Sequence, residues 1–185
     1  MKLPHGRMRY AVACAAMTLV AAPSGATSLI HQGLDRLTLQ NELVLRATVL
    51  DIHSYWNADH TLILTDVHTR PGLVLKGSAP GDVTFTVMGG TVGDVTTLIV
   101  GGADLAPGSE YVLFLAHADL PGAAHRLTVR DHAQGVFEIV KGRAFSEALE
   151  DPLLPDARGE TTVPGGEQGL ALDDLVHQVH AQSNR

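Results

Sequence analysis

Histidine and carboxylate side chains gather around one predicted hairpin of this sequence. His53 lies in a segment rich in β-branched residues, and Asp59 and His60 follow it across a short polar turn. Imidazole nitrogens and carboxylate oxygens are the donors that bind Zn²⁺ and Cu²⁺ in proteins. These three residues therefore form a candidate metal site, and the alternative interpretation, which we favour, is a solvated loop tip.

Two further histidines, His177 and His180, are three residues apart on a predicted C-terminal helix. They would need a third ligand from elsewhere and do not match the His-Glu-x-x-His pattern of zinc proteases, so we favour a surface role. His60 and His68 would lie about 26 Å apart along one extended strand, too far for one metal ion. A histidine-based metal-binding protein is our second functional interpretation.

An aromatic pair, Tyr55 and Trp56, precedes the same turn. In a small barrel such a loop can present aromatic anchors to a partner or a sugar, and the alternative is that Trp56 caps the end of the barrel. We predict that a partner protein binds this hairpin together with the loop at residues 89–94. The predicted partner-binding residues are Tyr55, Trp56, Asn57, Asp59 and His60.

The motifs of common enzyme families are missing from the sequence. It has no Gly-x-Ser-x-Gly nucleophile elbow, its one cysteine is Cys14, and the glycines at residues 89–94 lack the Lys-Ser/Thr of a phosphate-binding loop. We therefore predict a protein that is not an enzyme and uses no cofactor. A hydrolase with a scattered site is a third alternative.

Residues 1–26 have the features of a signal peptide. Basic residues precede an apolar core at residues 10–22, and Pro23-Ser24-Gly25-Ala26 supplies a breaker and small residues for cleavage after Ala26. The core is shorter than the roughly 20 residues that cross a bilayer. We expect export to the periplasm or the extracellular space, with no membrane span in the mature chain. An uncleaved anchor and a lipoprotein modified at Cys14 are the alternatives.

The predicted mature chain, residues 27–185, is acidic and contains no cysteine. The whole sequence has 13 Lys and Arg against 20 Asp and Glu, a net charge of −7, and three of the basic residues lie in the leader. Nucleic acid and anionic membrane surfaces are poor partners for such a chain, whereas a basic protein or a cation is suitable. No disulfide can form within the mature chain, so its stability must come from packing.

An uninterrupted apolar run at residues 111–116 predicts a central strand. The run is too short for most helices and does not alternate, so both faces should be covered, by a barrel or second layer on one side and a helix or loop on the other. Similar patterns predict about seven strands in all, and a change of phase near Val49 and Leu50 predicts a bulge in the first. The other predicted strands are residues 43–55, 60–66 with 73–75 beyond Pro71-Gly72, 83–88, 96–100, 126–130 and 136–140.

Apolar residues at helical spacing predict short helices at residues 29–39, after the candidate N-caps Thr27 and Ser28, and at residues 170–182. Asp173 and Asp174 would lie in the first turn of the second helix, where its dipole favours anions. Residues 150–169, rich in proline and glycine, predict a flexible loop. The predicted fold class is mainly β: a single domain, residues 27–185, forming a small antiparallel β-barrel with short N- and C-terminal helices.

Several segments resemble a group of exported bacterial proteins of unassigned function; they are residues 41–49, 74–77, 89–92, 107–115 and 134–137. The resemblance covers most of residues 28–180 and implies a fold and export, without catalytic residues. More distantly, Val-Leu-Arg-Ala-Thr-Val at residues 44–49, a hairpin and a strand ending in Leu75-Lys76-Gly77 resemble the start of the netrin-like domain of tissue inhibitors of metalloproteinases, an OB-type barrel.

Together these observations lead to one functional expectation. We expect an exported, non-enzymatic binding module that recognises another envelope or secreted protein, with proteases among the candidate partners. The resemblance implies a barrel of OB or netrin-like type.

Overall fold

The computed structural model describes residues 32–130, 132–146 and 169–183. The predicted signal peptide and nearly all of the predicted loop at residues 150–169 lie outside them. None of the helices in these ranges has the length and apolar character of a membrane-spanning segment. The elements in chain order are α1 (Leu34–Gln40), β1 (Leu43–Trp56), β2 (Ile63–Lys76), β3 (Val83–Met88), β4 (Gly90–Val92), β5 (Val95–Thr97), β6 (Glu110–Leu120), β7 (Ala123–Val129), the 3-10 helix η1 (His132–Gly135), β8 (Val136–Val140), β9 (Arg143–Ser146), β10 (Leu170–Ala171) and α2 (Leu172–Ser183).

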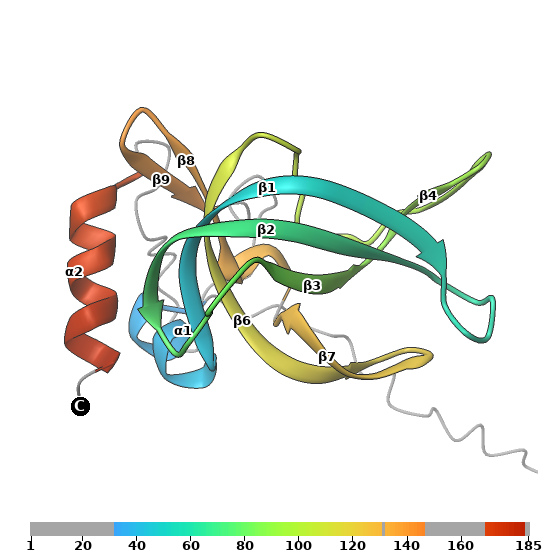
Figure 1. Ribbon diagram of the computed structural model, residues 1–185, viewed down its shortest axis with the longest axis horizontal. Coiled ribbons are helices and arrows are strands. Elements are labelled where there is room, and N and C mark those ends of the chain that lie inside the picture. The colour runs from blue at the N-terminus through green and yellow to red at the C-terminus, as the bar shows by residue number, and fades with distance from the viewer. Residues whose placement is uncertain (1–31, 131, 147–168, 184–185) are drawn as a thin grey trace, which may run out of the picture.

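One curled antiparallel sheet forms the body of the protein (Figure 1). Its strand order is β10-β9-β8-β6-β1-β2-β3, and β7 pairs with the second half of β6. The curl brings β3 next to β7, but the described residues form no ladder between these two strands, so the sheet is a half-barrel with an open seam. The predicted fold class, a mainly antiparallel β-barrel-like domain with short N- and C-terminal helices, is confirmed.

Strand β1 bends through a bulge at Leu50. Its register against β2 jumps between Val49 and Asp51, which leaves Leu50 without a partner on β2, as the change of sequence phase predicts. Leu45 and Val49 before the bulge and Ile52 after it all pack in the barrel interior. The extra residue keeps the apolar side chains of both halves on the inner face, because alternation alone would reverse the second half.

Strand β6 is covered on both faces, as its unbroken apolar run predicts. Residues 111–116 are all buried. Leu113 and Leu115 point into the barrel, whereas Val112 and Phe114 pack in a second cluster outside it. There Phe114 contacts Phe137 of β8, with ring centroids 5.8 Å apart.

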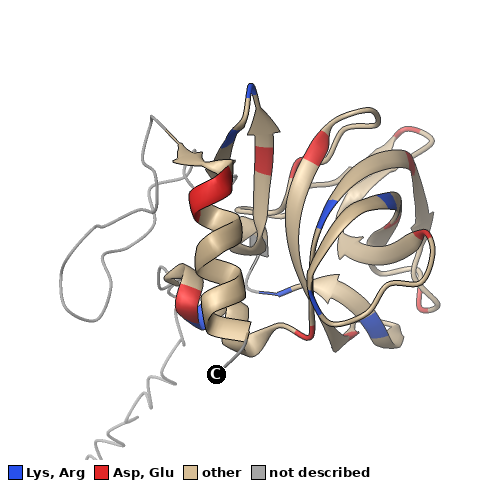
Figure 2. Cartoon of the chain, turned by 60° about the vertical axis from the view of Figure 1, so that its left-hand side comes forward, with Lys and Arg blue, Asp and Glu red and all other residues tan. Residues whose placement is uncertain are grey.

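The two helices cover the outer face of the sheet beside β6. Leu37 of α1, and Leu175 and Val179 of α2, are buried in the cluster that contains Phe114. The Lys76 ammonium donates to the carbonyl oxygens of Thr38 (2.6 Å) and Asn41 (2.7 Å), which ties the end of α1 to the end of β2. Asp173 and Asp174 occupy the first turn of α2, as predicted; this turn is red in Figure 2.

Helix α1 begins later than the predicted position 29. Its first residue is Leu34 and its N-cap is Gly33, which makes no side-chain cap, while the predicted caps Thr27 and Ser28 lie outside the described residues. Glycine is a poor helix former because it loses the most backbone entropy, so Gly33 is a natural boundary.

The predicted return strand also begins too early. It was expected to include His60, but β2 starts at Ile63, because Asn57 and the following residues form a turn. Further along, β2 continues through Pro71, and its register against β1 skips Gly72. Proline is tolerated there because β3 stops pairing with β2 at Thr69, so this part of β2 is a free edge.

The predicted strand at residues 96–100 is correct only for its first two residues. Residues 95–97 form β5, which pairs with β4 in a separate two-stranded hairpin, so the predicted loop at residues 89–94 contains a strand. Leu98 and Val100 are 85% and 77% exposed. Their apolar pattern is therefore not that of a buried strand. The short strands β9 and β10 were not predicted.

Candidate functional site

Asn57 organises the tip of the β1–β2 hairpin. It is 2% exposed, and its Oδ1 accepts the backbone N–H groups of Thr61 (2.9 Å) and Leu62 (3.1 Å). Its Nδ2 donates to Thr61 Oγ1 and to the Pro121 carbonyl oxygen, both at 3.1 Å. Asn57 thus acts through the shape of the turn rather than as an exposed contact residue.

The Pro121 bond joins two hairpins that are distant in sequence. Pro121 and Gly122 form the turn between β6 and β7, and Gly122 has a φ of 69°. A Cβ on Gly122 would lie only 2.9 Å from Asn57 Nδ2. Only glycine therefore permits both the backbone conformation and the close approach of the two turns. Pairing across 64 residues leaves no periodic trace in the sequence, which is why this junction was not predicted.

Three predicted site residues lie together at the exposed side of this tip. Asp59 and His60 are exposed, and the half-buried Trp56 stacks on His60, with ring centroids 6.2 Å apart and planes 25° apart. His60 has a φ of 52°, the left-handed conformation that turns its ring back over Trp56. We call Trp56, Asp59 and His60 the tip surface.

Tyr55 faces the other side of β1. It stacks on His53 at 6.2 Å, and its hydroxyl donates to Asp66 Oδ1 (3.1 Å), which also accepts from Thr86 Oγ1 (2.6 Å). Burial, the hydrogen bond to Asp66 and the charge of Asp66 raise the pKa of the Tyr55 hydroxyl above its ordinary value. Tyr55 therefore belongs to a polar row across β1, β2 and β3, and not to the tip surface.

The candidate metal ligands His53 and His60 lie on different sides of the hairpin, His53 with Tyr55 and His60 on the tip surface. His53 stacks with Tyr55 and His60 with Trp56, and adjacent residues of a strand point in opposite directions. Among the described residues, His177 and His180 of α2 included, no group of three His, Cys, Asp or Glu side chains is arranged to hold a metal ion.

A second histidine cluster was not anticipated. His117 of β6 and His125 of β7 stack with ring centroids 4.6 Å apart, and His117 Nδ1 lies 2.8 Å from Glu42 Oε2. The backbone N–H of His125 donates to Asp119 Oδ1 (2.8 Å). The contact between His117 and His125 depends on the register of the β6–β7 hairpin, which the sequence does not specify. The only sequence feature that pointed to it is that the two histidines flank a Pro-Gly turn.

Comparison with known proteins assigns no family. A scan against protein-family models finds no match for this chain, and a search of curated proteins finds no relative. The tip surface is therefore interpreted from its own geometry.

Replacing Asn57 by Ala should lower the free energy of unfolding by about 2 kcal/mol. The change leaves two N–H groups and the Pro121 carbonyl without their side-chain partner at a part-buried junction of two turns. Urea denaturation monitored by circular dichroism measures this loss. The matched control, Asp59→Ala at the exposed tip, should change stability by less than about 0.5 kcal/mol. Equal effects of the two substitutions would contradict a structural role for Asn57.

The pKa of Glu42 should depend on His117. The hydrogen bond from His117 lowers it below the ordinary 4.5, and the more distant His125 adds a smaller charge effect. A carboxylate whose pKa is lower in the folded protein stabilises the fold above the unfolded pKa, and this stabilisation is lost as the pH falls through the folded pKa.

Carbon-13 NMR titration of the Glu42 carboxyl measures this dependence. His117→Ala should raise the pKa of Glu42 towards its ordinary value, and His125→Ala should raise it less. If the Glu42 titration is the same in native protein and His117→Ala, the proposed interaction does not exist in solution.

Proposed function

We propose that this protein is an exported, non-enzymatic binding module that recognises another envelope or secreted protein through its tip surface. The observation that carries the proposal is the stacked pair of Trp56 and His60 on a turn fixed by Asn57. Tryptophan is among the residues most enriched at the energetic centres of protein interfaces. A turn already fixed in its bound shape loses little conformational entropy on binding.

The position of the tip in the fold also supports binding. We propose that the half-barrel is of OB or netrin-like type: β1 pairs with β2 and β6, while β7 follows β6 and lies beside β3, as in a five-stranded OB barrel. In OB folds the loop between the first two strands and the loop between the last two bind ligands. Asn57 and Pro121 join the corresponding loops here.

The charge distribution favours a protein partner over nucleic acid. The net charge is −7, and in Figure 2 the Lys and Arg residues are scattered over several elements rather than gathered on one face. Binding to nucleic acid requires a continuous basic surface. Export follows from the signal-peptide pattern, and proteases are one class of exported partner that the netrin-like resemblance suggests.

Affinity capture tests this proposal. The purified full-length chain, immobilised on a resin, is exposed to extracts of the producing cell's envelope and medium. We expect one protein to be retained. Trp56→Ala should weaken its binding at least tenfold, and His60→Ala should weaken it too, because both remove the stacked pair.

The matched control is Leu50→Ala, which truncates an exposed apolar side chain of the same strand at the bulge. This variant should retain the partner at native affinity. Circular dichroism at the assay temperature shows that each variant is folded. Retention of the same protein by folded Trp56→Ala at native affinity would show that the tip surface is not the binding site.

A further inference from the structure

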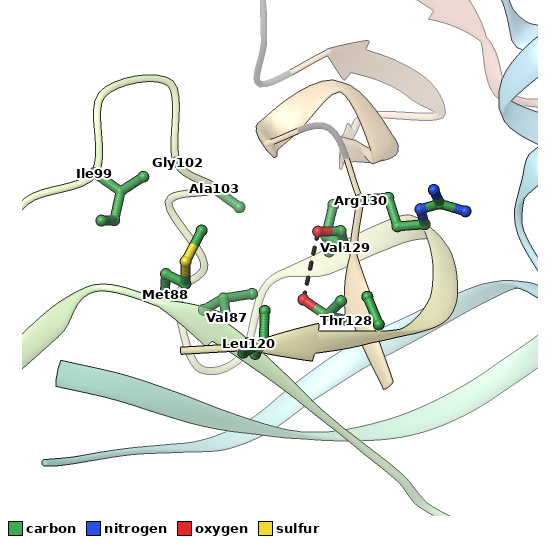
Figure 3. A pocket seen from close by; sticks show the side chains of 10 residues that line it. Val87, Met88, Ile99, Gly102, Ala103, Leu120, Thr128, Val129 and Arg130 are labelled. Atoms are coloured by element: carbon green, nitrogen blue, oxygen red, sulfur yellow. Dashed lines mark hydrogen bonds between the residues drawn. The ribbon is translucent and has the colours of Figure 1, made fainter. Parts of the chain in front are cut away.

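A divided hollow opens at the seam of the half-barrel. Its two adjoining parts have volumes of about 250 Å³ and about 380 Å³, within or near the range of small-molecule sites. Both parts are lined by Val87 and Met88 at the end of β3, and by Ile99, Gly102 and Ala103 of the segment that faces it (Figure 3). We call this hollow the seam cavity.

The wall opposite β3 is held in place by hydrogen bonds. The Gly102 N–H donates to the Ile99 carbonyl (2.9 Å), which closes a turn, and the Ala133 N–H of η1 donates to the Gly101 carbonyl (2.9 Å). At the end of the same segment the Ala106 N–H donates to the Tyr111 hydroxyl oxygen (3.1 Å). The seam cavity is therefore formed before any ligand arrives.

One part of the seam cavity is mainly apolar, with Thr128 and Arg130 as the polar residues of its lining. Figure 3 shows Ile99, Met88 and Leu120 around this part, while the guanidinium group of Arg130 points away from them. Leu98 and Val100, on either side of Ile99, expose most of their surface beside it. Large apolar side chains exposed next to an apolar cavity are typical of a binding surface.

The other part offers a hydrogen-bond acceptor. Thr65 Oγ1 donates its single hydrogen to the Gly89 carbonyl (2.6 Å) and lies 2.8 Å from Ser54 Oγ. Because a hydroxyl has only one hydrogen, Ser54 must be the donor of the second bond, and its own lone pairs are left to accept. Ser54 lines this part of the cavity, and Asp104 is the one carboxylate among its lining residues.

We propose that the seam cavity binds an uncharged amphiphile with a hydrocarbon chain and a terminal hydroxyl. The chain lies between β3, β7 and Ile99, and the hydroxyl donates to Ser54 Oγ. A carboxylate in this place would lose water without gaining a cation and would face Asp104. An ammonium group would also lose water, and because Asp104 is exposed, the attraction between these two charges is screened by solvent. The site is separate from the tip surface, so this inference does not rest on the proposed protein partner.

Calorimetric titration of the purified full-length chain with 1-decanol, decanoate and decylammonium at pH 7 tests the ligand class. We expect saturable binding of 1-decanol at least tenfold tighter than that of either charged probe, because an unpaired charge is disfavoured in the cavity. Absence of saturable binding, or tighter binding of a charged probe, overturns the proposal.

Substitutions in the lining test the location. Ala118→Phe and Ala103→Leu fill the seam cavity from different walls, and each should weaken 1-decanol binding at least tenfold. Ser54→Ala should weaken it about fivefold, because one hydrogen bond is lost. Ser109→Ala, outside the cavity, is the matched control and should bind as the native chain does.

Circular dichroism and thermal unfolding without ligand show which variants are folded. Should one cavity-filling variant fail to fold, the other and Ser54→Ala still decide the question. Native affinity for 1-decanol in the folded lining variants overturns the proposal.

Discussion

The extra residue at Leu50 in β1 is the constraint on which the rest of the structure depends. It leaves Leu50 without a partner on β2, so that Val49 and Ile52 both face the barrel interior. With uninterrupted alternation, Asp51 and His53 would be buried instead, and burial of unpaired polar groups is strongly unfavourable. The same bulge decides that Ser54 lines the seam cavity and that Tyr55 faces the polar row outside it.

Asn57 couples that strand to the opposite side of the half-barrel. Its amide binds its own turn and the Pro121 carbonyl, so the β1–β2 and β6–β7 turns form one unit at the end of the molecule. The sheet is covered elsewhere by α1 and α2, which pack on its outer face at the other end of β1. Both proposed binding features, the tip surface and the seam cavity, thus lie in the part of the half-barrel that the helices leave uncovered.

The sequence predicts a strand well where flanking turn residues and a β-branched interior indicate the same bounds. Residues 83–88 and 136–140 were predicted with the bounds of β3 and β8 for this reason. The covering of β6 on both faces follows from six apolar residues in a row. The apolar residues at 96–100 also suggested a buried strand, but Leu98 and Val100 are exposed beside a cavity.

The candidate site was predicted only in part, because its residues act across long sequence distances. Composition identified the hairpin with Trp56 and His60, which do stack. It could not show that Asn57 is buried, since the partner at Pro121 is 64 residues away, nor that His117 contacts His125, which depends on the register of β6 and β7.

The central claim is the register of β1 after its bulge, and cross-strand nuclear Overhauser contacts in the purified protein measure it directly. The structure predicts backbone contacts between His53 and Asp66 and between Tyr55 and Leu64, with no β2 partner opposite Leu50. Contacts of His53 with Thr65 and of Leu50 with His68 would mean an unbroken register. That result would contradict the placement of both the tip surface and the seam cavity.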